Sequence, residues 1–252
     1  MSLALDLPAD DPSIAALGPD ARARVARVWT ERSAAEQRAA VLFTLVARDL
    51  LADGAIPEVL DLATRAVHDE LRHVEVCRQV AARYAGTEVP WPAPEPAPEP
   101  GFRDAPPDLT RVLHVVFNTC IAESVGAAFL QVCRADAEGP LVRAALQVLL
   151  RDDVGHARIG WAHLASGRVA ARHLPAIGAA LPGLLRAVRD GWYERCAELD
   201  AREAPPPGHG CAPTVAIRGA VDMTLREVIV PGFEYLGLDT TAARRWLASV
   251  PA

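Results

Sequence analysis

The stretch from Val112 to Cys133 contains 22 residues with a single charged side chain, Glu123, near its centre. Its length and apolar character would suit a helix that crosses a membrane. A carboxylate at the middle of a bilayer is costly, however, and the polar residues His114 and Gln131 dilute the segment further. We therefore expect a helix that is surrounded by protein, with a central carboxylate that is paired or bound to a cation.

The whole chain has the patterning of helices. Alanine, leucine and arginine dominate, apolar residues recur with a period near 3.6, and strand-like alternation is nearly absent, which predicts an all-α fold. Gly and Pro signals divide the core into four helices, over residues 33–51 (with a start as early as 20), 57–84, 108–137 and 140–166. Further helices are expected over residues 174–201, 213–230 and 240–249.

Two short turns and one long connection organise the four core helices. Asp53-Gly54 and Glu138-Gly139-Pro140 are turn signals, which predict two antiparallel hairpins. Between the hairpins lies a segment, residues 88–100, whose many prolines favour an extended strut. Such a strut suits a four-helix bundle with one long crossover. A flexible linker between two domains is the alternative, although each hairpin alone would have a small core.

We predict a single domain, with an N-terminal segment (1–30), a metal-binding bundle (31–166) and a C-terminal helical extension (167–252). The net charge of −6 and the lack of a Lys/Arg-rich block argue against nucleic acid or a membrane surface as the partner. The first residues do not follow a signal-peptide pattern, and the five cysteines form no CxxC pair. We therefore expect a cytoplasmic protein with reduced thiols.

Two tracts combine carboxylates with a histidine at helical spacing: Asp69-Glu70-Leu71-Arg72-His73 and Asp152-Asp153-Val154-Gly155-His156. Residues three apart share a helix face, so each tract can direct one carboxylate and one imidazole at the same metal ion. With 32 acidic residues and 7 histidines in 252 positions, about one such match is expected by chance. In both tracts, however, a further Asp (Asp69 or Asp152) precedes the carboxylate and can accept the second ring N–H of a ligand histidine.

The positions of four carboxylates within the hairpins strengthen the metal interpretation. Glu36 and Glu70 lie 18 and 16 residues from the glycine of the first turn, on its two sides. Glu123 and Asp153 each lie 15 residues from the first residue of the second turn. All four also lie on apolar stripes, where a carboxylate stays ionised only if it is paired or bound to a cation. They are predicted to meet at one level of the bundle.

Each candidate also has a purely structural interpretation. Ser33-Ala-Ala-Glu36 is a capping-box pattern, in which Glu36 would close the start of a helix. The two acidic-x-x-His tracts could be surface carboxylates beside satisfied core histidines. A salt bridge from an arginine of another helix could account for Glu123.

Over about residues 30–166 the pattern resembles that of the ferritin-like superfamily of di-iron carboxylate proteins. That family carries Glu, Glu-x-x-His, Glu and Glu-x-x-His on four successive helices. This chain has Glu36, Glu70-x-x-His73, Glu123 and Asp153-x-x-His156, with Asp153 as the one departure. The resemblance implies a ferritin-like four-helix bundle that holds two iron ions, or iron and manganese, or manganese alone. In that scheme Glu36, Glu70 and His73 hold one ion, Glu123, Asp153 and His156 hold the other, and Glu70 and Glu123 are the bridges.

The activities of the superfamily range from iron storage to substrate oxygenation. Without a CxxC pair a rubrerythrin-like peroxidase is disfavoured, and without a tyrosine after Glu36 so is a ribonucleotide-reductase-like radical site. About 85 residues follow the bundle and could wall a pocket. We therefore predict an O₂-activating di-iron oxygenase or oxidase that acts on a small, fairly apolar substrate, with electrons from a ferredoxin or reductase. A ferroxidase or iron-handling protein, dimeric or cage-like, and a non-catalytic helical interaction protein are the alternatives.

The pocket beside the metals is expected to be lined by small and apolar residues, namely Ala40, Phe43, Cys77, Thr119, Cys120, Ala127, Gly160 and His163. Thr119 and Cys120 could guide protons or oxygen, or could simply belong to the core. His163, seven residues beyond His156 on nearly the same face, could be an additional ligand of the kind found in some ferritin-like N-oxygenases.

Overall fold

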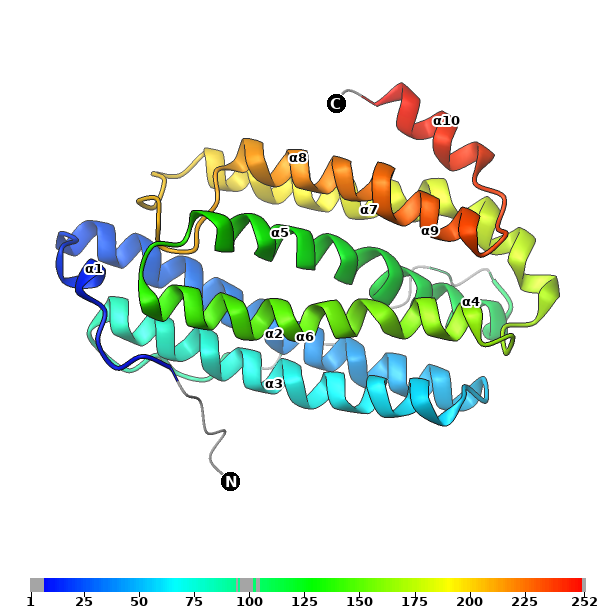
Figure 1. The fold of residues 1–252 in the computed structure, drawn as a ribbon, viewed down its shortest axis with the longest axis horizontal. Coiled ribbons are helices and arrows are strands. Elements are labelled where there is room, and N and C mark those ends of the chain that lie inside the picture. Colours follow the sequence, from blue (N-terminus) through cyan, green and yellow to red (C-terminus); the bar gives the residue numbers. More distant parts are fainter. Residues whose placement is uncertain (1–6, 94, 96–101, 103–104, 251–252) are drawn as a thin grey trace.

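The computed structural model describes residues 7–93, 95, 102 and 105–250, and throughout these residues the regular secondary structure is helical. The all-α prediction is confirmed. Long helices lie side by side with their connections at the two ends (Figure 1). The bundle contains α2 (Pro19–Ala52), α3 (Pro57–Ala85), α4 (Pro107–Val115), α5 (Glu123–Asp136) and α6 (Pro140–Ala165). The remaining helices are α1 (Pro12–Ala15), α7 (Leu174–Asp200), α8 (Thr214–Thr224), α9 (Val230–Tyr235) and α10 (Thr241–Ser249), with a short 3-10 turn at Ala171–His173.

The four-helix bundle consists of two hairpins, in which α2 packs along α3 and α5 packs along α6. The hairpins meet where α3 packs against α6. Proline occupies the first turn of α2, α3, α4 and α6, where its missing N–H removes no helical hydrogen bond. The first hairpin turns at Gly54, whose φ of 66° is a conformation that glycine adopts without strain.

Helix α2 begins at Pro19, near the earliest start that the sequence allowed. Trp29 in its third turn is completely buried, so this part of α2 packs into the protein core. Glu36 therefore lies in mid-helix, which excludes the capping-box interpretation. Ser33 instead donates a hydrogen bond to the Val74 carbonyl on α3, at 3.2 Å.

The third bundle helix runs from α4 into α5 without a break, but it widens into a π-helix over Val116–Ala122. Within this segment the side chains of Asn118 and Thr119 donate hydrogen bonds to the backbone carbonyls four residues earlier, at 2.8 and 2.7 Å. The π-helix ends directly before Glu123. Because a π-helix rotates the side chains that follow it, such segments are frequent at functional sites.

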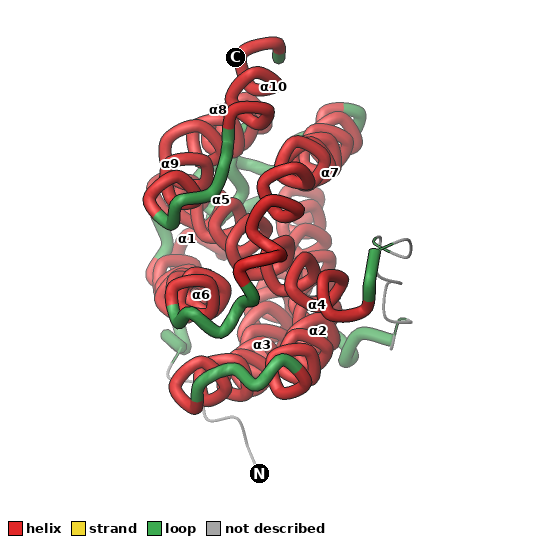
Figure 2. The backbone as a smooth tube through the Cα atoms, turned by 90° about the vertical axis from the view of Figure 1, so that its right-hand side faces the viewer, coloured by secondary structure: helices red, strands yellow, loops and turns green. Residues whose placement is uncertain are grey.

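Helices α7, α8 and α9 form a further layer on the α5 side of the bundle (Figure 2). Helix α8 packs against both α5 and α7, a second π-helix (Leu225–Ile229) joins α8 to α9, and α10 packs against α7. An apolar core fills the space between the layers, with the fully buried residues Ile121, Leu181, Leu185, Leu225 and Phe233 among its members. The C-terminal helices thus cover one face of the bundle.

The continuous helix Pro107–Asp136 is long and apolar enough to span a membrane by length and composition alone. More than half of its most apolar window, 56%, is buried inside the protein. Helix α6 packs on one side of it, and α7 and α8 pack on the other. These are the surroundings of a helix that packs inside the protein, as the central carboxylate predicted.

Part of the proline-rich crossover is described, namely residues 88–93 and 95, and it has no regular secondary structure. Arg78 on α3 donates two hydrogen bonds to the Val89 carbonyl, at 2.9 and 2.6 Å. Arg38 on α2 contacts Glu95 at 3.2 Å. This part of the crossover is therefore held against the first hairpin, while the rest of the predicted strut lies outside the described residues.

Candidate metal centre

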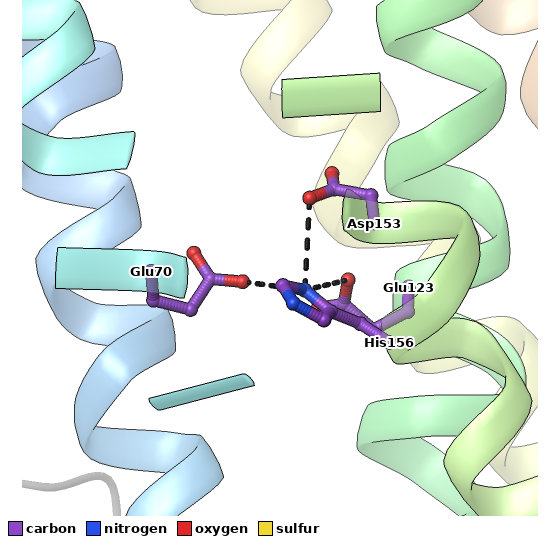
Figure 3. A group of neighbouring side chains, drawn as sticks. All are labelled: Glu70, Glu123, Asp153 and His156. Atoms are coloured by element: carbon purple, nitrogen blue, oxygen red, sulfur yellow. Dashed lines mark ion pairs between the residues drawn. The ribbon is translucent and has the colours of Figure 1, made fainter. Parts of the chain in front are cut away.

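Each of the four core helices directs one carboxylate into the interior of the bundle. Figure 3 shows Glu70 on α3 facing Glu123 on α5 and both Asp153 and His156 on α6. The potential ligand atoms form two groups whose members lie within 4.8 Å of one another: Glu70, Glu123, Asp153 and His156 in one, and Glu36, Glu70 and His73 in the other. The structure therefore brings all six predicted ligands together at one level of the bundle.

Glu70 belongs to both groups because its two oxygens face the two histidines. Its Oε1 lies 2.9 Å from His156 Nδ1, and its Oε2 lies 3.5 Å from His73 Nδ1. The ring centres of the two histidines are 5.9 Å apart. A carboxylate between two imidazoles is placed to be shared by two metal ions, which matches the position expected for Glu70.

Asp153 also lies near both histidines, although it belongs to only one of the two groups. Its Oδ1 lies 3.7 Å from Nδ1 of His73 and 3.7 Å from Nδ1 of His156. Glu123 is instead near His156, at 3.8 Å, and Glu36 is near His73, at 3.9 Å. Asp153 is thus at the same distance from both histidines, whereas Glu123, which was expected to be a bridge, lies beside His156. Helices α3 and α6 pack directly together, so their carboxylates fill the middle while α2 and α5 approach from the outside.

The outer nitrogens of both histidines meet the Asp of the opposite tract. His73 Nε2 lies 3.2 Å from Asp152 Oδ2 on α6, and His156 Nε2 lies 3.5 Å from Asp69 Oδ2 on α3. A carboxylate at Nε2 keeps the proton on that nitrogen, which leaves the Nδ1 lone pair to face the interior. The predicted role of the two Asp residues is therefore matched by the geometry, but across the helices rather than within each tract.

Arg72 links these two outer carboxylates. Its Nη2 donates to Asp69 at 2.9 Å and also to Asp152, although the two residues belong to different helices. Without this guanidinium the two negative charges would repel each other near the histidines. The sequence contained the signal, because Arg72 lies inside the first tract, but helical spacing alone did not assign it a role.

The charges inside the cluster perturb one another strongly. Burial, followed by repulsion from Glu70, raises the pKa of Glu36 well above its usual value, and burial with Asp153 does the same for Glu123. Burial and the charge of Glu70 raise the pKa of Asp153 to about 7. Although burial opposes it, the approach of His156 and then His73 lowers the pKa of Glu70 to about 2. The positive charge near these four carboxylates is too small to balance their negative charges.

Several inward-facing atoms are buried without a hydrogen bond among the described residues, namely Glu70 Oε2, His73 Nδ1, Asp153 Oδ1 and His156 Nδ1. Even the close approach of His156 to Glu70 lacks the alignment of a hydrogen bond. Buried polar atoms without partners are costly, so a converging set of them points to a missing ligand. Oxygen and imidazole donors with this arrangement fit divalent transition-metal ions.

Comparison with known proteins agrees with the fold. No family model and no curated protein matches the sequence. A solved structure does match, described as "Protein 19 with aldehyde deformylating oxidase activity from Synechococcus", at 19% identity and a TM-score of 0.58. The match covers 91% of this chain and 97% of the other, so it includes the C-terminal helices as well as the bundle. The chain has a ferritin-like fold.

Within this ferritin-like bundle, Thr119 and Cys120 are both completely buried and pack against Gly160 of α6. Thr119 donates its hydroxyl hydrogen bond to a backbone carbonyl, and burial raises the pKa of the Cys120 thiol. A Cβ at Gly160 would lie 2.5 Å from Cys120 Sγ, so the glycine lets the π-helix approach α6 closely. The two residues thus serve the packing beside the metal centre. Phe43 packs against His156, with ring centres 4.9 Å apart.

His163 lies outside both groups of potential ligand atoms. It is 2% exposed, and neither ring nitrogen has a hydrogen-bond partner among the described residues. It lines a different cavity, of about 170 Å³, beside Asp53 and His173 near the other end of α6. Two helical turns of about 11 Å separate it from His156, which explains why a shared face did not bring it to the cluster.

Proposed function

We propose that the six clustered residues hold two divalent metal ions, iron or a combination of iron and manganese, and that the protein is an O₂-dependent oxidoreductase. The observation that carries this proposal is the set of unpartnered Nδ1 and carboxylate atoms that converge from four helices. Four carboxylates carry a formal charge of −4, which two divalent cations would neutralise. When bound, such ions would supply the electrons for the reduction of O₂ beside a substrate.

The protein side chains prepare this site before any metal binds. Asp69 and Asp152 hold the protons on the outer histidine nitrogens, and Arg72 holds the two aspartates in place. Phe43 covers one ring and excludes water from it. The ligand positions are therefore fixed by packing and by hydrogen bonds, which reduces the rearrangement that binding requires.

Access to the site is proposed from the α2–α5 side. The Glu36 and Glu123 side chains are 15% and 16% exposed, whereas Glu70 and His73 are 2% exposed or less. On the side of the two outer aspartates, Arg72 contacts both Asp69 and Asp152. A small, fairly apolar substrate and O₂ would then approach beside Glu36 and Glu123, and a ferredoxin or reductase would supply electrons.

The name of the structural neighbour mentions an aldehyde deformylating oxidase activity, which supports an oxidase reaction over iron storage. The layer formed by α7, α8 and α9 supports the same choice, because it provides a cavity wall beyond the four bundle helices. All five cysteines are free thiols, and this favours a cytoplasmic location.

The test is elemental analysis of protein produced with iron and manganese supplements, beside a Glu123→Ala variant. We expect about two transition-metal ions per chain in the wild type and a clear loss in the variant, with unchanged helical circular dichroism. A folded wild type without metal would contradict the proposal and leave a helical interaction protein. O₂ uptake with a chemical reductant then separates the rivals, because a ferroxidase consumes O₂ strictly in proportion to added iron(II).

A further inference from the structure

A cavity of about 410 Å³ lies between the third and fourth turns of α2, the middle of α5, and helices α7 and α8. The loop that joins α7 to α8, at the left of Figure 1, closes one side of it. Its volume is in the range of sites that bind small organic molecules. Much of the wall is apolar, with contributions from Val28, Phe129, Trp192, Leu199, Ile217 and Ala212.

Arg32 in the wall of this cavity is almost fully buried, at 5% exposure. Its Nη2 donates to the Gly210 carbonyl at 3.1 Å, and its guanidinium lies 4.4 Å from the centre of the Trp29 ring. Its Nη1 is buried and has no hydrogen-bond partner among the described residues. A buried cation with a free donor is costly unless an anion completes its contacts.

Arg195 on α7 is a second, half-buried cation in the same wall. In the described part of the chain it forms no ion pair, whereas Arg202 at the same cavity is paired with Glu31 at 2.8 Å. Burial, and then repulsion from Arg32, lowers the pKa of Arg195. The two carboxylates that also line the cavity, Glu31 and Asp200, are paired with Arg202 and Arg218. Among the described residues, Arg32 and Arg195 therefore face the cavity without an ion pair of their own.

We propose that this cavity binds an organic carboxylate, with its head group held by Arg32 and Arg195 and its apolar body against Phe129 and Trp192. Guanidinium groups bind carboxylates through paired N–H donors, and the free Nη1 of Arg32 supplies such a donor. The two aromatic rings lie 4.9 Å apart and offer a continuous apolar surface to the rest of the molecule.

The cavity lies on the same side of the bundle as the more exposed metal-site carboxylates. Arg32 precedes Glu36 by four residues, about 6 Å along α2, and Phe129 follows Glu123 on α5. A carboxylate bound here would therefore lie close to the metal centre and is the candidate substrate. This last step rests on the proposed function, whereas binding in the cavity does not.

The test uses two acids, octanoate and 2-naphthoate, with 1-octanol and 2-naphthylmethanol as neutral counterparts of similar size. Binding is measured by isothermal titration calorimetry on the full chain. We expect each acid to bind more tightly than its alcohol, and at least one acid to bind with one site per chain. Arg195→Gln should weaken the binding of the acids roughly tenfold or more, as expected for the loss of a charge-assisted hydrogen bond. Arg186→Gln, an exposed change on the same helix, should leave binding unchanged.

The outcomes separate this inference from the proposed function. Glu123→Ala, which is expected to lose metal, should still bind the acids, and a result of that kind supports the cavity whatever the metal centre does. Because Arg32 is buried, Arg32→Lys is used only after its circular dichroism and melting temperature have been shown to match those of the wild type. This variant should also weaken the binding of the acids. Absence of binding, equal binding of the alcohols, or equal losses in Arg195→Gln and Arg186→Gln would overturn the proposal. Tighter binding of octyl phosphate than of octanoate would overturn the choice of a carboxylate.

Discussion

His73 on α3 is held by Asp152 on α6, at 3.2 Å, and not by the aspartate of its own tract. The reciprocal contact joins His156 on α6 to Asp69 on α3, at 3.5 Å. Each histidine is therefore positioned by the helix that carries the other one. The relative rotation and height of α3 and α6 consequently fix both imidazoles at once, and a disturbance of either helix is transmitted to both halves of the centre.

Replacing Asp152 by Asn removes the negative charge that holds the proton on His73 Nε2 while keeping the side-chain size. We expect metal affinity to fall about 10–100-fold, since partners of ligand histidines commonly contribute that much. Competition titration with Mn²⁺ against a chromogenic chelator measures the change. Asp61→Asn on α3, at an exposed carboxylate paired with Arg65, is the matched control and should leave the affinity unaltered. Equal affinities for both variants would show that the crossed contact is unimportant.

Arg72→Gln leaves Asp69 and Asp152 facing each other without their shared cation. The expected result is a roughly tenfold loss of metal affinity with little change in helix content, because ligands remain but their orientation loosens. Arg65→Gln, seven residues earlier on the same helix and exposed, provides the comparison. If both arginine variants bind Mn²⁺ as the wild type does, Arg72 has no positioning role.

Gly160→Ala tests the close packing of the π-helix on α6. The added methyl group would meet Thr119 and Cys120, whose backbone N lies 3.3 Å from the new Cβ position. Overpacking of this kind should lower the free energy of unfolding by about 1–3 kcal/mol, which urea unfolding measures. Gly155→Ala on the same helix meets nothing within 4 Å and should stabilise by about 0.5–1 kcal/mol through helix propensity. A stabilised Gly160→Ala variant would rule out the tight contact.

The metal-free protein should lose stability as the pH rises from 6.5 to 9. Burial opposes the shift, but Asp69 and Glu70 raise the pKa of His156 from 6.5 to about 10, so its contribution is complete below pH 6.5 and is lost toward pH 10. The pKa of Asp153 is raised to about 7, so its contribution to stability is lost as the pH rises toward 7. Above that pH it adds little further change. We expect the melting temperature to fall by roughly 3 °C or more, equivalent to about 1 kcal/mol for a chain of this size.

The same thermal scans with bound Mn²⁺ provide the counterpart to this prediction. Metal ligands must be deprotonated, so the melting temperature of the metal-loaded protein should rise relative to that of the metal-free protein as the pH rises. His156→Gln removes the group with the raised pKa and should flatten the pH dependence of the metal-free protein. A melting temperature that is constant or rises between pH 6.5 and 9 would contradict the assigned charges.

The sequence by itself determined the helices, the hairpin pairing and the set of six clustered residues. Helical periodicity and the distance of each residue from a turn are local quantities, and they place Glu36, Glu70, Glu123 and Asp153 at one level. The start of α2 at Pro19 is close to the earliest start that the sequence allowed, whereas no residue pattern announced the π-helix before Glu123.

Only the tertiary structure decided how the helices rotate and approach one another. That rotation places Asp153 at the same distance from both histidines, crosses the aspartates between the two tracts and leaves His163 outside the cluster. It also brings Arg32 and Arg195, which are far apart in the sequence, to one cavity. Periodicity states which residues share a helix face, but contacts between helices depend on side-chain packing at each crossing, which the spacing within one helix does not encode.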